Sequence, residues 1–71
     1  MLEERLRGLR KERNLTQREV YSAVGLSERN YQSFEYGQVR PSYDTLIALA
    51  NFFDVSLDYL VGRTDKQEVN R

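Results

Sequence analysis

The sequence predicts an all-α fold, a compact bundle of five short helices, and three observations carry this prediction. Apolar side chains recur three and four residues apart in successive segments, which is the spacing of one helix face and not the alternation of a strand. A serine or threonine that can cap a helix precedes four of the five segments, and glycine follows three of them. A chain of 71 residues suits one domain with one core, so the segments are expected to pack together.

The first expected helix spans about residues 2–13. Glu3 precedes Arg7 by four residues, a spacing at which opposite charges favour a helix. Gly8 falls away from the apolar stripe, so it is expected at an exposed position, where it costs up to about 1 kcal/mol relative to alanine. The stripe consists of Leu2, Leu6 and Leu9.

Residues 16–37 are the most informative segment, because they predict two short helices and the tight turn between them. Thr16 can cap the first of these helices, and Glu19 can reach back to the Thr16 amide, which completes a capping box. Gly25 is expected to end this helix, because glycine takes positive φ without steric cost. The apolar stripe of this helix is Val20, Ala23 and Val24.

Ser27 can cap the next helix, and Gly37 is expected to end it. The two helices and the glycine turn, at residues 17–36, have the layout of a helix-turn-helix motif, whose second helix lies in the DNA major groove. Tyr31 and Phe34 share the apolar face of this second helix, whereas the outward face carries Arg29, Gln32, Ser33 and Tyr36.

The C-terminal half predicts two further helices. Ser42 can cap one of them after the extended stretch 38–41, and Ser56 can cap a short one that ends at Gly62. The apolar positions of the two helices are Leu46, Ile47, Leu49, Ala50 and Phe53, and then Leu57, Tyr59, Leu60 and Val61.

Residues 63–71 differ in composition from the rest of the chain. They contain one apolar side chain, Val69, so they are expected to form a flexible tail. The folded domain is therefore expected to span residues 1–62, and no repeat or low-complexity segment divides it.

Composition excludes most enzyme and metal-binding classes. The chain has no cysteine and no histidine, so it lacks thiolate and imidazole metal ligands and the commonest general base. No segment approaches the roughly 18 apolar residues of a membrane span, and the charged N-terminal stretch lacks the apolar centre of a signal peptide. We expect a soluble, cytoplasmic protein that is no enzyme, uses no metal or cofactor, and has no segment large enough to bind a small-molecule ligand.

Net charge is less informative than the motifs. Eleven basic and eleven acidic residues cancel, although a nucleic-acid binder is expected to carry a basic face. Residues 1–40 hold eight Lys or Arg and six Asp or Glu, a balance of +2, and residues 41–71 hold three and five, a balance of −2. The positive excess lies with the predicted helix-turn-helix, which favours DNA binding only slightly.

The order and spacing of six short motifs resemble the Cro/C1-type (XRE) helix-turn-helix family, named for phage repressors. The resemblance covers residues 2–65 and implies the lambda-repressor-like DNA-binding fold. The motifs are Leu15-Thr16-Gln17, Val20 and Val24 with Gly25, Phe34-Glu35-Tyr36-Gly37, Arg40-Pro41-Ser42, the apolar positions from Leu46 to Phe53, and Val55-Ser56-Leu57-Asp58-Tyr59-Leu60. Tyr21 departs from the family, which usually has a small residue there, so Tyr21 either tilts outward or opens the angle between the two helices.

The resemblance implies which residues meet DNA. Family members read bases from the start and outward face of the third helix, and those positions hold Glu28, Arg29, Gln32 and Ser33. Arg29 suits guanine, whose O6 and N7 a guanidinium binds together, while Gln32 suits adenine and Glu28 suits cytosine N4. Contacts to the DNA phosphates are expected from Thr16, Gln17, Tyr36 and Arg40. For each of these residues the alternative is an ordinary solvated or capping position.

Arg10 and Glu35 lie on or beside the core side of their helices, which is unusual for charged residues. The resemblance suggests that they form a structural ion pair between the first and third helices, and the alternative is that both side chains reach water. Phe52, Leu57 and Tyr59 are expected either in the core or in the seam of a homodimer, since family members usually bind DNA as two-fold dimers.

The sequence therefore predicts a sequence-specific, double-stranded-DNA-binding transcriptional regulator, a homodimeric repressor that reads an inverted-repeat operator through its third helix. Two other classes remain open. The chain could be the antitoxin of a toxin–antitoxin pair and bind a toxin protein. It could also be a protein-interaction module that has lost DNA binding, which its neutral charge would allow.

Overall fold

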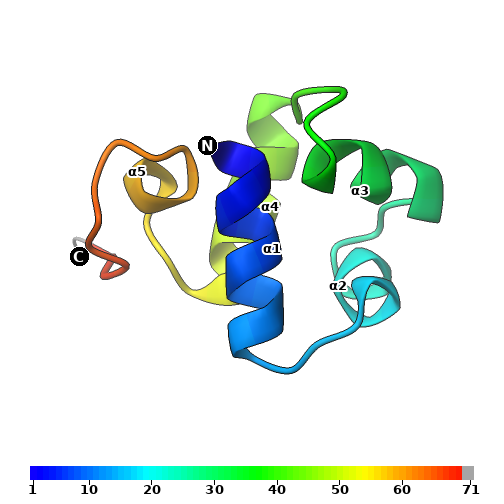
Figure 1. Ribbon diagram of the computed structural model, residues 1–71, viewed down its shortest axis with the longest axis horizontal. Coiled ribbons are helices and arrows are strands. Elements are labelled where there is room, and N and C mark those ends of the chain that lie inside the picture. The colour runs from blue at the N-terminus through cyan, green and yellow to red at the C-terminus, as the bar shows by residue number, and fades with distance from the viewer. Residues whose placement is uncertain (70–71) are drawn as a thin grey trace.

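The computed structural model describes residues 1–69, which form five α-helices and no β-strand (Figure 1). In chain order the helices are α1 (Leu2–Glu12), α2 (Gln17–Ala23), α3 (Glu28–Glu35), α4 (Tyr43–Phe53) and α5 (Leu57–Leu60). The predicted all-α fold and the helix-turn-helix at residues 17–36 are confirmed. Helix ends differ slightly, because α1 ends one residue early, and Val24, Tyr36 and Val61 follow α2, α3 and α5 as C-cap residues instead of belonging to them. None of these helices is long and apolar enough to cross a membrane.

The last four helices begin at the predicted serine or threonine. The side-chain oxygen of each cap accepts a hydrogen bond from the backbone N–H three residues later. At the start of α2, Glu19 N donates to the Thr16 hydroxyl at 3.1 Å, and Thr16 N donates to the Glu19 carboxylate at 2.9 Å. These two bonds are the predicted capping box. The four caps are Thr16, Ser27, Ser42 and Ser56.

Each of the five helices ends beside a residue with positive φ, and a backbone hydrogen bond closes its last turn. After α3, Gly37 has a φ of 73°, and Gln38 N donates to Ser33 O at 3.0 Å, as in a Schellman motif. After α1 and α4 the positive φ belongs to Asn14 and Asp54, whose short polar side chains tolerate it better than most. These two helix ends were not predicted from the sequence, because glycine is the usual signal for positive φ.

The core lies where the helices meet. α1 runs through the middle of the molecule, with α5 on one side, α2 and α3 on the other, and α4 behind it (Figure 1). Tyr31 from α3 and Phe53 from α4 are the largest fully buried side chains. Burying each large apolar side chain contributes about 1.5–3 kcal/mol, and without cysteine the chain forms no disulfide. The buried apolar residues are Leu6, Leu9, Val20, Tyr31, Phe34, Leu49, Ala50, Phe53, Val55 and Leu60.

The outer face of α1 differs from the prediction in one respect. Gly8 is exposed, and an added Cβ would meet nothing within 4 Å, as expected for a position away from the core. Glu3, however, pairs with the N-terminal ammonium group at 3.1 Å, and Arg7 turns toward α3. Within residues 1–69, Glu3 and Arg7 therefore do not form the ion pair that their spacing of four residues suggests.

The described part of the expected tail contacts the helices. Arg5 donates to Asp65 at 2.9 Å, and Ser56 N donates to Gln67 O at 3.0 Å. The Gln67 side chain also donates to the Tyr59 hydroxyl at 3.3 Å. Flexibility of residues 63–69 stays a prediction, and residues 70–71 of the expected tail lie outside the described residues.

Candidate nucleic-acid interface

The outward face of α3 holds the four residues expected to read bases. α2 and α3 pack against each other at the end of the molecule away from α5 (Figure 1). Tyr31 and Phe34 bury one face of α3 in the core, which turns the opposite face outward. On that outward face Glu28 and Arg29 are exposed, and Gln32 and Ser33 are half-buried.

Arg29 is the freest of these side chains. Within residues 1–69 its guanidinium makes no hydrogen bond and no ion pair. Its donors are therefore open to a ligand, and two of them can bind guanine O6 and N7 together. Ser33, in contrast, donates its hydroxyl hydrogen to Asn30 O at 2.7 Å, so its oxygen is left as an acceptor.

Gln17 is expected at a phosphate. Its side-chain amide lies between the buried end of α3 and the outward face of that helix. Its Nε2 donates to Glu35 Oε1 at 3.1 Å, and its Oε1 accepts from Gln32 Nε2 at 3.2 Å. Gln32 Nε2 also lies 3.4 Å from Glu28 Oε1, one turn earlier on α3. Residue spacing along two separate helices does not reveal these amide hydrogen bonds, so they were not predicted from the sequence.

Arg10 and Glu35 form a two-point ion pair between α1 and the last residue of α3. Arg10 Nε lies 2.7 Å from Glu35 Oε2, and Arg10 Nη2 lies 3.1 Å from Glu35 Oε1. Glu35 is wholly buried, and the Arg10 side chain is 14% exposed. Arg10 Nη1 also donates to Leu15 O at 3.1 Å, which ties the pair to the connection that leads into α2. Glu35 therefore does not reach water, and Arg10 scarcely does.

The surroundings of Glu35 keep it charged. Burial by itself raises the pKa of the Glu35 carboxyl, but hydrogen bonds from Arg10 and Gln17 and the nearby Tyr31 hydroxyl outweigh burial and lower it. Burial raises the pKa of Tyr31, and the Glu35 carboxylate raises it further. Among residues 1–69 the Tyr31 hydroxyl makes no hydrogen bond of ordinary geometry, so its effect on the carboxylate is that of a nearby O–H dipole.

Arg7 is a second contact between α1 and α3 that the sequence analysis missed. Its guanidinium donates to the backbone carbonyl oxygen of Glu35. That carbonyl belongs to the last turn of α3, where the helix dipole is negative and a cation is stabilising. The available signal was spacing, because Arg7 precedes Arg10 by three residues and so shares its side of α1.

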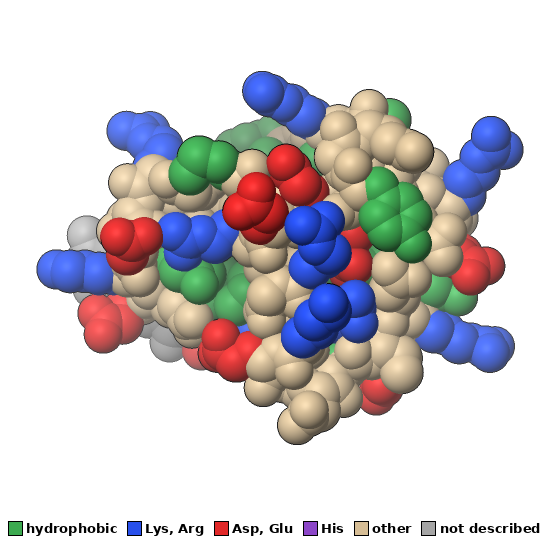
Figure 2. All heavy atoms as spheres, in the orientation of Figure 1, with side chains coloured by type: hydrophobic (Ala, Val, Ile, Leu, Met, Phe, Trp, Pro, Cys, Tyr) green, Lys and Arg blue, Asp and Glu red, His purple; other side chains and the backbone are tan. Residues whose placement is uncertain are grey.

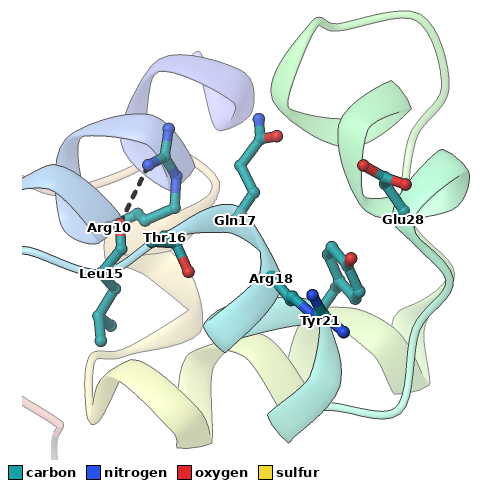
Figure 3. Close-up of a pocket in the computed structure, with 7 residues that line it drawn as sticks. All are labelled: Arg10, Leu15, Thr16, Gln17, Arg18, Tyr21 and Glu28. Atoms are coloured by element: carbon teal, nitrogen blue, oxygen red, sulfur yellow. Dashed lines mark hydrogen bonds between the residues drawn. The ribbon is translucent and has the colours of Figure 1, made fainter.

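Three of the residues expected at phosphates lie near the start of α2 or after the end of α3. Thr16, Tyr36 and Arg40 are exposed, and within residues 1–69 no hydrogen bond or ion pair engages the Arg40 guanidinium. Figure 3 shows an open groove, with Gln17 and Arg18 of α2 on one side and Glu28 of α3 on the other. Arg18, exposed at the start of α2, was not singled out from the sequence although it adds a cation beside Thr16. The groove is lined by Arg10, Leu15, Thr16, Gln17, Arg18, Tyr21 and Glu28.

Tyr21 occupies the wall of this groove between α2 and α3 (Figure 3). It is half-buried, and its ring centroid lies 6.4 Å from that of Tyr31 with the ring planes tilted by 46°. Aromatic rings at this separation attract each other. The bulky side chain is therefore accommodated at the edge of the core, partly turned to solvent.

The three residues expected in the core or a dimer seam differ in exposure. Phe52 is 37% exposed and packs edge-on against the Phe53 ring, 5.0 Å away between centroids. Leu57 is half-buried and lines a shallow groove with Val69. Tyr59 is half-buried, and the Arg5 guanidinium lies 4.0 Å from its ring centroid.

Surface charge is mixed. On the face that Figure 2 shows, basic and acidic side chains are intermingled, with a small group of neighbouring basic side chains near the centre. This mixture agrees with the net charge of zero.

Three comparisons with known proteins agree with this geometry. The model of a protein family described as helix-turn-helix matches residues 6–60. The HTH-type transcriptional regulator YqaE of Bacillus subtilis is 38% identical over 69 residues, which are 97% of this chain and 60% of YqaE. The transcriptional repressor RstR of the cryptic phage CTXphi in Vibrio cholerae is 33% identical over 69 residues, which are 94% of this chain and 62% of RstR. This chain thus spans less than two thirds of either relative.

Comparison with a solved structure supports the same family as the sequence matches. The NMR structure of the DNA-binding domain of the P22 c2 repressor matches with a TM-score of 0.84 and 28% identity, over 99% of this chain and 91% of that domain. The family match, the two named regulators and this fold all point to one group. The chain belongs to the Cro/C1-type helix-turn-helix family, whose members are DNA-binding regulators and not enzymes.

Proposed function

We propose that this protein is a transcriptional repressor that binds an inverted-repeat operator in double-stranded DNA as a homodimer and reads its bases through α3. One observation carries the proposal: Arg29 stands unpaired on the outward face of a helix whose other face is fixed in the core. RstR and P22 c2 are both named repressors, which supports repression over activation. A regulator of this kind acts on DNA in the cytoplasm and needs no cofactor.

Base reading falls to the outward face of α3. Arg29 supplies donors for guanine, and the acceptor atoms of Glu28, Gln32 and Ser33 face the bases beside it. Thr16, Gln17, Tyr36 and Arg40 contact phosphates on either side and set the position of α3 in the major groove. Arg40 is the strongest of these four, because its charge is exposed and no described residue neutralises it.

The size of the domain supports the proposed dimer. Its principal extents are 31, 23 and 19 Å, so one copy covers about one helical turn of DNA. Two copies related by a two-fold axis read two half-sites whose centres lie about 34 Å apart. The seam is expected around Phe52 near the end of α4 and Leu57 and Tyr59 of α5, and α5 lies across α1 from α2 (Figure 1).

Selection of bound sequences from a random pool of duplex DNA tests the proposal. The expected result is an enriched inverted repeat, bound more tightly than bulk DNA at about 150 mM salt, with a dimer in the complex. Enrichment of no motif, with affinity equal to that for bulk DNA, would refute sequence-specific binding. An enriched single half-site bound by a monomer would refute only the dimer.

A further inference from the structure

Two glutamine side chains connect the buried Glu35 carboxylate to the reading face of α3. Gln17 Nε2 lies 3.1 Å from Glu35 Oε1, and Gln32 Nε2 lies 3.2 Å from Gln17 Oε1. A further bond of 3.4 Å leads from Gln32 Nε2 to Glu28 Oε1. The connection begins at a wholly buried charge and ends at a half-buried side chain that faces outward.

The direction of each bond is set by the one before it. An ionised carboxylate only accepts hydrogen bonds, so Gln17 must turn its NH2 group toward Glu35. The Gln17 carbonyl oxygen then faces Gln32, and only the NH2 group of Gln32 can meet it. Glu28 reinforces this orientation, because its carboxylate accepts from the same nitrogen.

The orientation leaves Gln32 with one free polar group. Its NH2 group has two hydrogens, and the two acceptors Gln17 and Glu28 occupy both. Its carbonyl oxygen has no hydrogen-bond partner within residues 1–69. Gln32 can thus accept a hydrogen bond from a ligand but cannot donate one without giving up a contact within the protein.

We propose that Glu35, through Gln17, sets the base preference of Gln32 by holding its carbonyl oxygen toward DNA and its NH2 group toward the protein. The inference rests on the proposed function and goes beyond it, because it makes Gln17 and Glu35 positioning residues for specificity. Glu35 is charged at neutral pH, since its surroundings lower its pKa, so the orientation is fixed under physiological conditions.

The consequence for DNA is a preference for bases that donate. A free glutamine binds adenine at two points, with NH2 to N7 and carbonyl oxygen to the N6 amine. Gln32 held by Gln17 offers only the acceptor, so it suits the adenine N6 or cytosine N4 amine and disfavours guanine and thymine, which show acceptors in the major groove. It also gains nothing from adenine N7.

The first test uses the free protein and needs no DNA. Side-chain NH2 resonances of Gln17 and Gln32 are assigned by NMR in the wild type, in Glu35→Gln, in Gln17→Met and in the double variant. Glu35→Gln lets residue 35 donate as well as accept, so the Gln32 NH2 resonances are expected to shift. In the Gln17→Met background the same substitution should leave them unchanged. We call the connection from Glu35 through Gln17 to Gln32 the relay. Gln32 resonances that do not change in Glu35→Gln, or that shift equally in the absence of Gln17, would overturn it.

The second test reads the base preference. The base pair that Gln32 contacts is identified as the position of the selected operator at which Gln32→Ala loses discrimination. The wild type is expected to bind adenine or cytosine there about fivefold or more tighter than guanine or thymine. Replacing that adenine by 7-deazaadenine, which lacks N7, should change wild-type affinity by less than about twofold. In Gln17→Met one hydrogen of the Gln32 NH2 group is released and can reach adenine N7, while Glu28 still accepts the other, so the same replacement should weaken binding by several-fold.

A control variant and two outcomes distinguish failure of the relay from failure of the proposed function. Lys11→Met, an exposed substitution on α1, is expected to keep the wild-type base preference. A wild type that prefers guanine or thymine at the Gln32 position, or that is sensitive to 7-deazaadenine, would overturn the relay while leaving the proposed function intact. A wild type that selects no DNA motif would overturn the proposed function and the base preference together, and the NMR measurement would still decide whether the orientation exists.

Discussion

Arg10 binds Glu35 at two points, with 2.7 Å from Nε to Oε2 and 3.1 Å from Nη2 to Oε1. The contact joins the last turn of α1 to the end of the helix proposed to read DNA. Because Glu35 is wholly buried, its charge has no access to water when Arg10 is removed. The pair therefore holds α3 to α1, and losing one partner leaves the other charge without its mate.

A double-mutant cycle tests this statement. Arg10→Met and Glu35→Gln are each expected to lower the free energy of unfolding by about 3 kcal/mol, because each leaves one charged or polar partner buried without its mate. The double variant should lose clearly less than the sum, because it leaves no unpaired charge. Denaturant unfolding of the four proteins gives these values. Additive losses would mean that the two side chains contribute independently.

Stability should fall in acid through the same residue. The pKa of Glu35 in the folded state is lowered below the unfolded value of about 4.3. Its contribution is therefore fully present above that value and disappears as the pH falls through the folded-state pKa. Urea unfolding between about pH 5 and pH 2 should show a shallower loss in Glu35→Gln than in the wild type. Glu12→Gln, an exposed carboxylate on α1, is the matched control and should keep the wild-type slope.

Arg29 and Arg40 should affect DNA binding in different ways. Arg29→Ala is expected to lose about 1–3 kcal/mol at one base position of each half-site and to relax preference there, because the side chain lies on the outward face of α3. Arg40→Ala should weaken all sequences alike and reduce the salt slope by about 1 per half-site, as a phosphate contact does. Affinities for a panel of single-base operator changes, measured at several salt concentrations, separate the two.

The control for this pair is Arg63→Ala. Arg63 is exposed on the α5 side and lies 4.0 Å from Asp58, so its loss removes the same charge far from the reading face. It should leave base preference unchanged. Uniform loss of affinity in both Arg29→Ala and Arg40→Ala would mean that Arg29 does not read bases.

Most of the fold could be predicted because its signals are local. Capping residues such as Thr16 and Ser27 act on amides three residues away, so a short stretch of sequence is enough to place helix starts. Helix ends at Gly25 and Gly37 are equally local. Asn14 and Asp54 were missed because several residue types tolerate positive φ, and only packing of the following segment decides where it occurs.

The site was less predictable because its contacts cross helices. The outward position of Arg29 follows from helical angle alone. The Gln17 bond to Glu35 and the Arg7 bond to the Glu35 carbonyl depend on how α1, α2 and α3 approach one another, which no spacing along the chain contains. The family resemblance supplied the Arg10 and Glu35 pair but not the contacts that Gln17 and Arg7 make with Glu35.

Two glycine substitutions should have opposite signs. Gly8→Ala is expected to stabilise the protein by up to about 1 kcal/mol, because it improves helix propensity at an exposed position with no atom within 4 Å. Gly25→Ala should destabilise by about 1–2 kcal/mol, because φ at residue 25 is +74° although the space around it is open. Thermal or urea unfolding gives both values. A Gly25→Ala protein as stable as the wild type would show that the turn between α2 and α3 can adopt another conformation.

Arg7 should stabilise the end of α3 without contributing to the core. Arg7→Met removes the donor to the Glu35 carbonyl, so stability should fall by about 1.5–3 kcal/mol, and backbone amides in the last turn of α3 should exchange faster with solvent. Operator affinity should fall at temperatures where the variant is folded, because the reading helix is less well fixed. Arg5→Met is the matched control, since Arg5 lies on the same helix but contacts Asp65 and Tyr59 on the α5 side. It should leave hydrogen exchange in α3 unchanged, and an equal effect of both variants on α3 would mean that Arg7 acts only through global stability.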